Sequence, residues 1–212
     1  MRPISLIISA FGPFSGTTTL QFDDLKQHSL FLISGPTGAG KTSILDAMVF
    51  ALFGETSGRL RNGQTMRSDY ATDTMATVVT FEFAIGHDKY KIERAPKQTL
   101  KEKRGVGTRE VDATAILWTW DGEAWQEYSS RRTEVANKIQ EILGFRVDQF
   151  LQVVLLPQGE FRKLLVAPTS EREALMNSLF KTDIFKRLQD VLKEEYNEVV
   201  ASAKSVIDEQ QY

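Results

Sequence analysis

The 212-residue sequence contains no cysteine, only two histidines and no apolar run long enough to cross a membrane. Disulfides, thiolate nucleophiles and zinc–thiolate sites are therefore excluded within these residues. The formal net charge is −2, which lacks the basic excess that phosphate-driven nucleic-acid binding usually leaves on a domain. The apolar stretch within residues 1–10 is too short and broken for a signal peptide, so we expect a soluble, cytoplasmic protein.

The clearest motif is Gly35-Pro-Thr-Gly-Ala-Gly-Lys41-Thr42, which satisfies the phosphate-loop pattern in full. Its glycines let the backbone turn so that N–H groups point at phosphates, and a following helix adds free amides. Lys41 is expected to reach the β- and γ-phosphates, and Thr42 to hold Mg²⁺. The motif predicts binding of ATP and Mg²⁺ at Gly35, Pro36, Thr37, Gly38, Ala39, Gly40, Lys41, Thr42 and Ser43.

The segments around this loop fit a strand–loop–helix unit. Residues 30–34 form an apolar run, typical of a strand buried on both faces. Residues 43–53 carry apolar side chains at helical spacing, and Gly54 is a suitable helix end. Residues 3–10 and 18–22 predict two strands joined by a loop of glycine and proline.

Alternating apolar and polar residues predict a mostly antiparallel β lobe over about 77–128. Within it, Asp121-Gly122 favours a two-residue type I′ turn, which would place Trp118 opposite Trp125. The polar, glycine-containing segment 97–107 is interpreted as a mobile loop between strands.

The sequence is mainly helical from residue 131 onward. One helical face ends at Gly144, and Ser170 to Glu173 forms a capping box. An apolar stripe over residues 188–206 continues without a stop signal, as at the start of a coiled coil. We therefore divide the chain into a head segment, residues 1–182, and the start of a coiled coil, residues 183–212.

Hydrolysis of ATP also requires a carboxylate on the metal and a group that positions water. The best candidate at a strand end is Asp121, but its place beside Gly122 favours a turn former whose carboxylate points to solvent. No other apolar strand ends in an acidic pair, so the predicted site is incomplete within these residues.

Three sequence blocks stand out together: residues 11–14 with Ile33–Ala47 and Ala51–Gly54, then Met66–Ala71, then Phe150–Phe161. They resemble the N-terminal ATPase segment of the SbcC family, the SMC-like subunits of bacterial SbcCD nuclease complexes. The resemblance covers essentially the whole chain, and the third block is its most specific part. It implies an α/β, P-loop ABC-type (SMC-like) head segment with an antiparallel β lobe and a helical start of a coiled coil.

The resemblance also implies a function, namely ATP binding and hydrolysis that power DNA double-strand-break and end processing. In that family the metal-binding Asp, the catalytic Glu and the signature motif lie in a C-terminal segment of a split head. The implied partners are that segment, a second head that dimerises around ATP, an SbcD-type nuclease and double-stranded DNA ends. Residues 150–161 would contain the Q-loop, where Gln158 contacts Mg²⁺ or the attacking water and Lys41 is the other catalytic residue. For Arg67, a structural salt bridge and a nucleotide contact both stay open.

Basic residues gather on the segment between the strands of the β lobe, at Lys97, Lys101, Lys103, Arg104 and Arg109. Such a cluster could follow DNA phosphates, and Lys101, Lys103 and Arg104 are the candidate contacts. A solvated loop is the alternative interpretation.

Two other functions fit the phosphate loop. A transport-type ATP-binding cassette domain would carry its signature and second acidic motifs in one compact chain, and neither is seen here. A DNA clamp or scaffold module could bind ATP without hydrolysing it. A phosphate-loop kinase is disfavoured, because nothing indicates an acceptor-binding lid.

Overall fold

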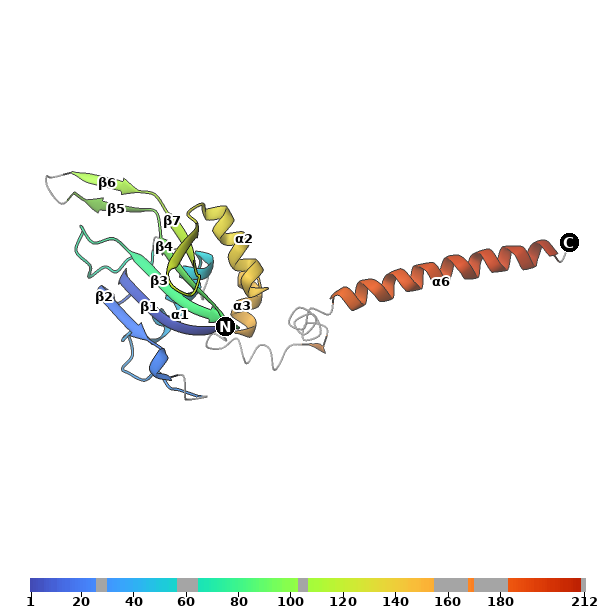
Figure 1. Ribbon diagram of the computed structural model, residues 1–212, viewed down its shortest axis with the longest axis horizontal. Helices are drawn as coiled ribbons and strands as arrows, with labels where there is room; N and C mark the ends of the chain where they lie inside the picture. The colour runs from blue at the N-terminus through green and yellow to red at the C-terminus, as the bar shows by residue number, and fades with distance from the viewer. Residues whose placement is uncertain (26–29, 57–64, 103–106, 155–167, 170–182, 211–212) are drawn as a thin grey trace. The chain divides into compact units, whose positions relative to one another are not determined.

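The computed structural model describes residues 1–25, 30–56, 65–102, 107–154, 168–169 and 183–210 (Figure 1). The chain divides into two compact units, Met1–Leu151 and Gln152–Tyr212. All the strands in the described residues belong to the first unit, which also contains the phosphate-loop motif.

A six-stranded antiparallel sheet forms the centre of the first unit, with the strand order β2-β1-β3-β4-β7-β8. The predicted hairpin near the N-terminus and the predicted antiparallel strands after residue 77 are both confirmed. The strands are β1 (Arg2–Phe11), β2 (Phe14–Gln21), β3 (Val78–Ile85), β4 (Asp88–Ala95), β7 (Thr114–Trp120) and β8 (Trp125–Ser129).

Alternate residues of these strands form one buried face, as the period of two along a strand requires. Helix α1 (Lys41–Phe53) contacts β1, β3 and β4, and α2 (Arg132–Leu143) contacts β7 and α1. The short elements are η1 (Asp23–Leu25) and α3 (Val147–Val153). The fully buried core of this unit includes Leu6, Ile8, Phe81, Phe83, Ile92, Leu117 and Ile139.

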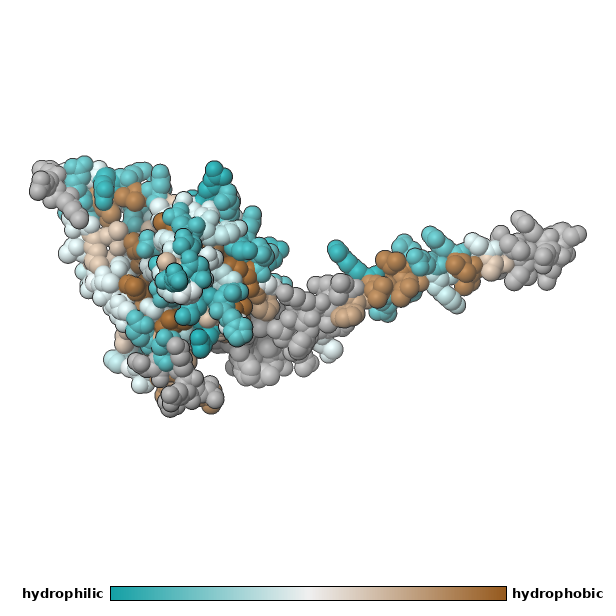
Figure 2. Space-filling view, viewed as in Figure 1, coloured by the Kyte–Doolittle hydropathy of each residue, from teal (hydrophilic) through white to brown (hydrophobic). Residues whose placement is uncertain are grey.

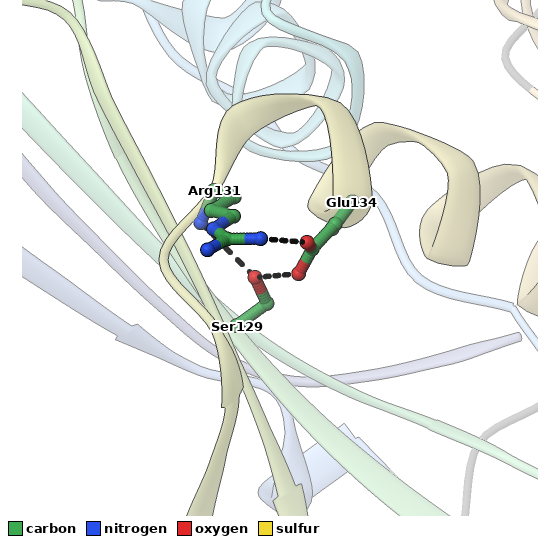
Figure 3. Close-up of polar contacts among 3 residues, drawn as sticks. All are labelled: Ser129, Arg131 and Glu134. Atoms are coloured by element: carbon green, nitrogen blue, oxygen red, sulfur yellow. Dashed lines mark hydrogen bonds and ion pairs between the residues drawn. The ribbon is translucent and has the colours of Figure 1, made fainter.

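Helices α1 and α2 both end at the predicted glycines. Gly54 and Gly144 adopt left-handed backbone conformations, with φ of 79° and 69°, and each donates its N–H to a carbonyl of the last turn. Such a C-terminal glycine is favoured because a side chain would strain the left-handed conformation. At the start of α2, the Ser129 hydroxyl accepts a bond from the Arg131 N–H and donates to the Glu134 carboxylate (Figure 3).

The predicted two-residue turn at Asp121-Gly122 is wrong. The loop has four residues, so Trp120 pairs with Trp125 and Trp118 pairs with Glu127. The reason lies in the Asp121 side chain, whose carboxylate accepts bonds from the backbone N–H groups of Glu123 and Ala124. These bonds widen the loop by two residues, so the cross-strand partners of Trp118 to Trp120 lie two residues further along β8 than the two-residue turn predicts. The aromatic pair is therefore Trp120 with Trp125, whose ring centroids lie 5.2 Å apart.

The prediction of a loop over residues 97–107 is wrong in its described part. Strands β5 (Gln98–Lys101) and β6 (Thr108–Val111) pair antiparallel as a separate two-stranded sheet, which extends beyond the six-stranded sheet in Figure 1. The ribbon is only partly polar, because Leu100 of β5 is buried together with Gln98. Buried Gln98 fixes its base through two bonds with the backbone of Thr77.

The prediction of a buried strand at residues 30–34 is also wrong for this structure. The segment is not a strand, and Leu30 and Leu32 are 90% and 87% exposed. A strand is held by hydrogen bonds to neighbouring strands, and no strand of the described residues pairs with this segment. The apolar run therefore has the composition of a buried strand without the neighbours that would bury it.

In the second unit, helix α6 (Asp183–Gln210) is 28 residues long. Hydrophobic side chains recur along it on the surface (Figure 2), including exposed Leu188, Leu192, Tyr196 and Val199. The capping box at residues 170–173 lies outside the described residues. None of the helices in the described part of the chain combines the length and apolar character needed to cross a membrane.

Candidate nucleotide-binding site

The phosphate-loop motif forms an exposed loop that leads directly into α1. Gly38 and Gly40 have φ of 84° and 91°, a left-handed conformation that glycine adopts without strain. The Ala39 N–H bonds to the Pro36 carbonyl at 3.2 Å, and α1 begins at Lys41. The two glycines therefore allow the turn through which the loop meets the helix.

The ammonium group of Lys41 reaches back over this loop. It donates hydrogen bonds to the carbonyl oxygens of Gly35, at 2.9 Å, and Pro36, at 2.8 Å. Lys41 is half-buried, whereas Thr42 beside it is exposed. The cationic group is thus held at the loop itself, where a phosphate bound by the loop would meet it.

The N-terminus of α1 suits an anion. Its cap residue is Gly40, no side chain caps the first amides, and the first turn has no acidic residue. The first N–H groups of a helix lack partners within the helix, and the helix dipole makes this end positive. The loop, Lys41 and the helix end together fit the triphosphate of a nucleotide.

The tip of the β1–β2 hairpin packs against this loop. A Cβ atom built on Gly40 would lie 2.7 Å from Pro13 Cγ and 3.0 Å from Phe14 Cζ. A Cβ on Gly12 would lie 3.2 Å from the hydroxyl of Ser43. The first sequence block thus supports the loop by close backbone contact, which explains why glycine occupies both positions.

The second block is anchored to the same hairpin. The Gly12 N–H bonds to the Met66 carbonyl at 2.7 Å, and the Arg67 guanidinium donates to the carbonyls of Met75, at 2.6 Å, and Thr72, at 2.9 Å. Arg67 Nη1 also lies 3.5 Å from the Thr77 hydroxyl, so the partners seen in the described residues are neutral oxygens, and a nucleotide contact stays a prediction. Arg67 organises the segment between the hairpin tip and β3.

The opposite end of α1 is held by a residue that the sequence interpretation missed. Arg94, on β4, is 8% exposed and donates to the carbonyls of Ala51, at 2.9 Å, and Leu52, at 3.2 Å. Burial, and secondarily the positive charge of Arg132, lowers the pKa of Arg94 to about 10, so the guanidinium is still charged at neutral pH. The alternation of β4 could have indicated that Arg94 is buried, because Arg94 is two residues from buried Ile92 and lies on the same face of the strand.

The described residues contain no candidate metal site built from acidic side chains. No group of three or more His, Asp or Glu residues that could hold a metal occurs among the described residues. The Asp121 carboxylate is committed to its turn, and it also accepts a bond from Gln126 at 2.9 Å. These bonds lower the pKa of Asp121 to about 2. Its interpretation as a turn former agrees with this geometry, and Gln158 lies outside the described residues.

The candidate DNA contacts are only partly described. Lys101 is ion-paired with Asp73 at 2.5 Å, and Lys97 with Glu110 at 2.9 Å. Residues Lys103 and Arg104 lie outside the described residues. The paired acids reduce the net positive charge that this ribbon presents.

Comparison with known proteins identifies the family. The sequence model of the AAA domain family matches residues 5–211. The chain belongs to the AAA domain family. This AAA domain chain is 40% identical to the SbcC subunit of the SbcCD nuclease of Vibrio cholerae, over 98% of the chain and 21% of that protein. It is 38% identical to the corresponding SbcCD protein of Lactococcus lactis and 37% identical to that of Staphylococcus aureus, over 95% and 92% of the chain and 19% of each of those proteins.

These relatives confirm the predicted resemblance to SbcC. The AAA domain chain spans about a fifth of the length of the relatives it matches. The α/β fold class, an SMC-like ATPase head segment with an antiparallel sheet, is also confirmed.

Proposed function

We propose that this chain binds Mg-ATP at residues 35–43 as the N-terminal part of a split ATPase head. The main support is the loop that ends in the uncapped N-terminus of α1, with the Lys41 ammonium bonded to two of its carbonyls. On phosphate binding, Lys41 exchanges these neutral acceptors for charged oxygens, which form stronger hydrogen bonds. The loop amides and the helix end hold the remaining phosphate oxygens.

Mg²⁺ fits the exposed hydroxyl of Thr42, the second residue of α1, as in other phosphate loops. When bound, the ion neutralises charge on the β- and γ-phosphates. Gln158 is proposed as its further ligand or as the residue that orients water. Lys41 would stabilise charge on the transferred phosphate and so act in catalysis as well as in binding.

Several features support a head completed by a further segment. Asp121 is committed to a turn, the exposed segment at residues 30–34 lacks strand neighbours in the described chain, and the matched relatives are about five times longer. The metal-binding carboxylate and the catalytic base would come from the later part of such a polypeptide. Residues 183–212 would then begin the coiled coil, with the apolar residues of α6 facing a returning helix.

The wider proposal follows from the relatives, which are subunits of the SbcCD nuclease. This chain would supply ATP-driven motion to a nuclease partner that processes DNA ends, with two heads closing around ATP. Lys101, Lys103 and Arg104 are its proposed DNA contacts. Because Lys101 is paired with Asp73, a DNA phosphate would have to displace that carboxylate.

Nucleotide binding by the Lys41→Ala variant tests the proposal. We expect the 212-residue chain to bind a fluorescent ATP analogue with Mg²⁺, and Lys41→Ala to weaken binding about a hundredfold or more, as loss of a charge-assisted contact predicts. Lys89→Ala is the matched control, because Lys89 is an exposed lysine on β4 in the same unit. Equal binding by Lys41→Ala and Lys89→Ala would reject the assigned site.

A further inference from the structure

Helix α1 links the phosphate loop to the centre of the sheet. It has 13 residues and begins immediately after Gly40, so its first turn carries Lys41 and Thr42. Its other end is reached by Arg94, whose carbonyl partners are Ala51 and Leu52. From Lys41 to Leu52 the helix rises about 16 Å, at about 1.5 Å per residue. A helix of this length moves as a rod, so a tilt at one end displaces the other.

The Arg94 contact is specific to the end of the helix. The last turn of α1 contains no basic residue of its own, and its final carbonyls lack partners within the helix. A positive charge at this end also interacts favourably with the helix dipole. Arg94 satisfies two of these carbonyls from a neighbouring strand, and Gly54 satisfies the Phe50 carbonyl.

The strand that carries Arg94 is held firmly in the sheet and can therefore anchor the end of α1. β4 lies inside the six-stranded sheet, between β3 and β7, and Arg94 pairs with Val79 on one side and Ala115 on the other. Both of those neighbours are fully buried. The guanidinium therefore projects from one of the most constrained backbone positions of the unit.

Space around the guanidinium is also restricted. A Cβ atom on Gly54 would lie 3.2 Å from Arg94 Nη1. Burying a charged group without a carboxylate is costly, and an apolar side chain would fill the same space without that cost. Among the described residues Arg94 forms no ion pair. Its hydrogen bonds to α1 are therefore the interaction that an apolar side chain at this position could not make.

We infer that Arg94 is a positioning residue for the phosphate loop, because it fixes the C-terminal end of the helix whose N-terminal end binds phosphate. The inference rests on the proposed binding of ATP at residues 35–43. The hairpin tip at Pro13 and Phe14 supports the loop at one end of α1, and Arg94 sets the direction of the helix at the other.

Three variants of the 212-residue chain test this inference. Arg94→Met keeps the approximate length of the side chain and removes every side-chain donor, whereas Arg94→Lys keeps a charged donor group for the same carbonyls. Leu117→Ala is the matched control, because it removes a fully buried side chain on β7, the strand that packs on α2. Thermal midpoints are measured first, and affinity is then compared at a temperature where every variant is folded.

We expect Arg94→Met to weaken Mg-ATP binding about tenfold, since misplacing a binding group by about 1 Å can cost up to about a hundredfold. Arg94→Lys should recover part of that loss, and Leu117→Ala should lower the thermal midpoint without changing affinity. If Arg94→Met fails to fold, Arg94→Lys carries the comparison with Leu117→Ala. Affinity that is unchanged in the Arg94 variants, or lost equally in Leu117→Ala, would overturn the inference.

Hydrogen exchange separates this inference from the proposed function. We expect Arg94→Met to speed amide exchange over residues 38–44 without nucleotide, while the amides of β1 stay protected as in the parent chain. If Lys41→Ala bound ATP as well as the parent chain, the proposed site would fail, yet the exchange result would still decide the role of Arg94. Exchange over residues 38–44 that does not change in Arg94→Met would count against it directly.

Discussion

At the scale of single residues, Gly40 meets three structural requirements that no other residue type meets together. It is buried, its φ of 91° lies in the left-handed region, and it provides the N-cap of α1 without a side chain. A Cβ there would meet the ring atoms of Pro13 and Phe14 at 3.0 Å or less. Those rings belong to a hairpin tip that is itself tied to Met66, so they have little freedom to move away.

Replacing this glycine should therefore affect both stability and binding. We expect Gly40→Ala to lower the free energy of unfolding by about 1–3 kcal/mol, through overpacking and backbone strain. Mg-ATP binding should weaken as well, because the displaced tip and loop no longer orient the first amides of α1. Chemical denaturation and titration with a fluorescent ATP analogue measure the two effects.

Gly16→Ala provides the control for this prediction. Gly16 lies on β2, where a Cβ atom would have no heavy atom within 4 Å. We expect this variant to match the parent chain in both measurements. A Gly40→Ala variant that was as stable as Gly16→Ala would show that the hairpin tip does not restrict the loop.

At the scale of elements, a set of side-chain hydrogen bonds joins β8 to α2. The Ser129 hydroxyl bonds to the Arg131 N–H at 3.0 Å and to the Glu134 carboxylate at 2.8 Å, and Arg131 also pairs with Glu134 at 3.0 Å (Figure 3). The bonds from Ser129 and Arg131 lower the pKa of Glu134. Because that pKa is depressed in the folded state, the contribution of the junction is present at neutral pH and is lost on acidification.

Removing the hydroxyl should weaken the start of α2. We expect Ser129→Ala to lower the free energy of unfolding by about 1 kcal/mol at neutral pH, as the loss of a hydrogen-bonding hydroxyl usually does. Ser130→Ala is the adjacent control, because Ser130 is exposed. Urea denaturation at pH 7 compares the two variants, and a Ser129→Ala variant no less stable than Ser130→Ala would refute the assigned role.

The elements that could be predicted from the sequence are those set by local pattern. The alternation in β3 and β4, the presence of a helix at α1 and the glycine at its end agree with the structure, although the buried residues of α1, Ala47 and Val49 to Leu52, do not form the predicted stripe. The register of the β7–β8 hairpin could not be read this way, because the Asp121 side chain selects a longer loop than Asp-Gly usually forms. Local pattern also gives no sign that residues 98–101, of which only Leu100 is apolar, pair with 108–111.

The candidate site shows the same division. The phosphate loop is predictable because its chemistry is contained in eight consecutive residues. The contacts that support it join residues far apart in the chain, as with Arg94 and Ala51 or Gly40 and Pro13. Such contacts depend on how α1 packs on the sheet. That packing is set by the whole fold and cannot be read from any one segment of the sequence.

At the scale of the whole molecule, residues 30–34 are where the chain departs most from its own sequence pattern. Leu30 and Leu32 are more than four-fifths exposed, although an apolar run before a phosphate loop is typical of a buried strand. Exposed apolar surface of this kind often marks an interface. In the proposed split head, the run would become a strand only when the later part of the polypeptide supplies its neighbours.

Mixing the two parts tests this view. We expect the 212-residue chain alone to bind Mg-ATP with negligible turnover, and ATP hydrolysis to appear when the downstream part of the same polypeptide is added. Leu32→Asp should abolish that gain, because a charge cannot be buried in the strand without a partner. The thermal midpoint and ATP affinity of the chain alone should not change, since Leu32 is exposed there.

Tyr70→Asp is the control that distinguishes loss of a specific interface at Leu32 from a general effect of replacing an exposed apolar side chain by a charge. Tyr70 is 82% exposed in the same unit, so the substitution places the same charge on another exposed apolar side chain. We expect Tyr70→Asp to keep the gain in turnover that Leu32→Asp loses. Equal gains in both variants would mean that residues 30–34 stay outside the completed head. Turnover by the 212-residue chain alone would mean that its own acidic residues complete the site, because Lys41, the loop amides and Gln158 provide no carboxylate for the metal.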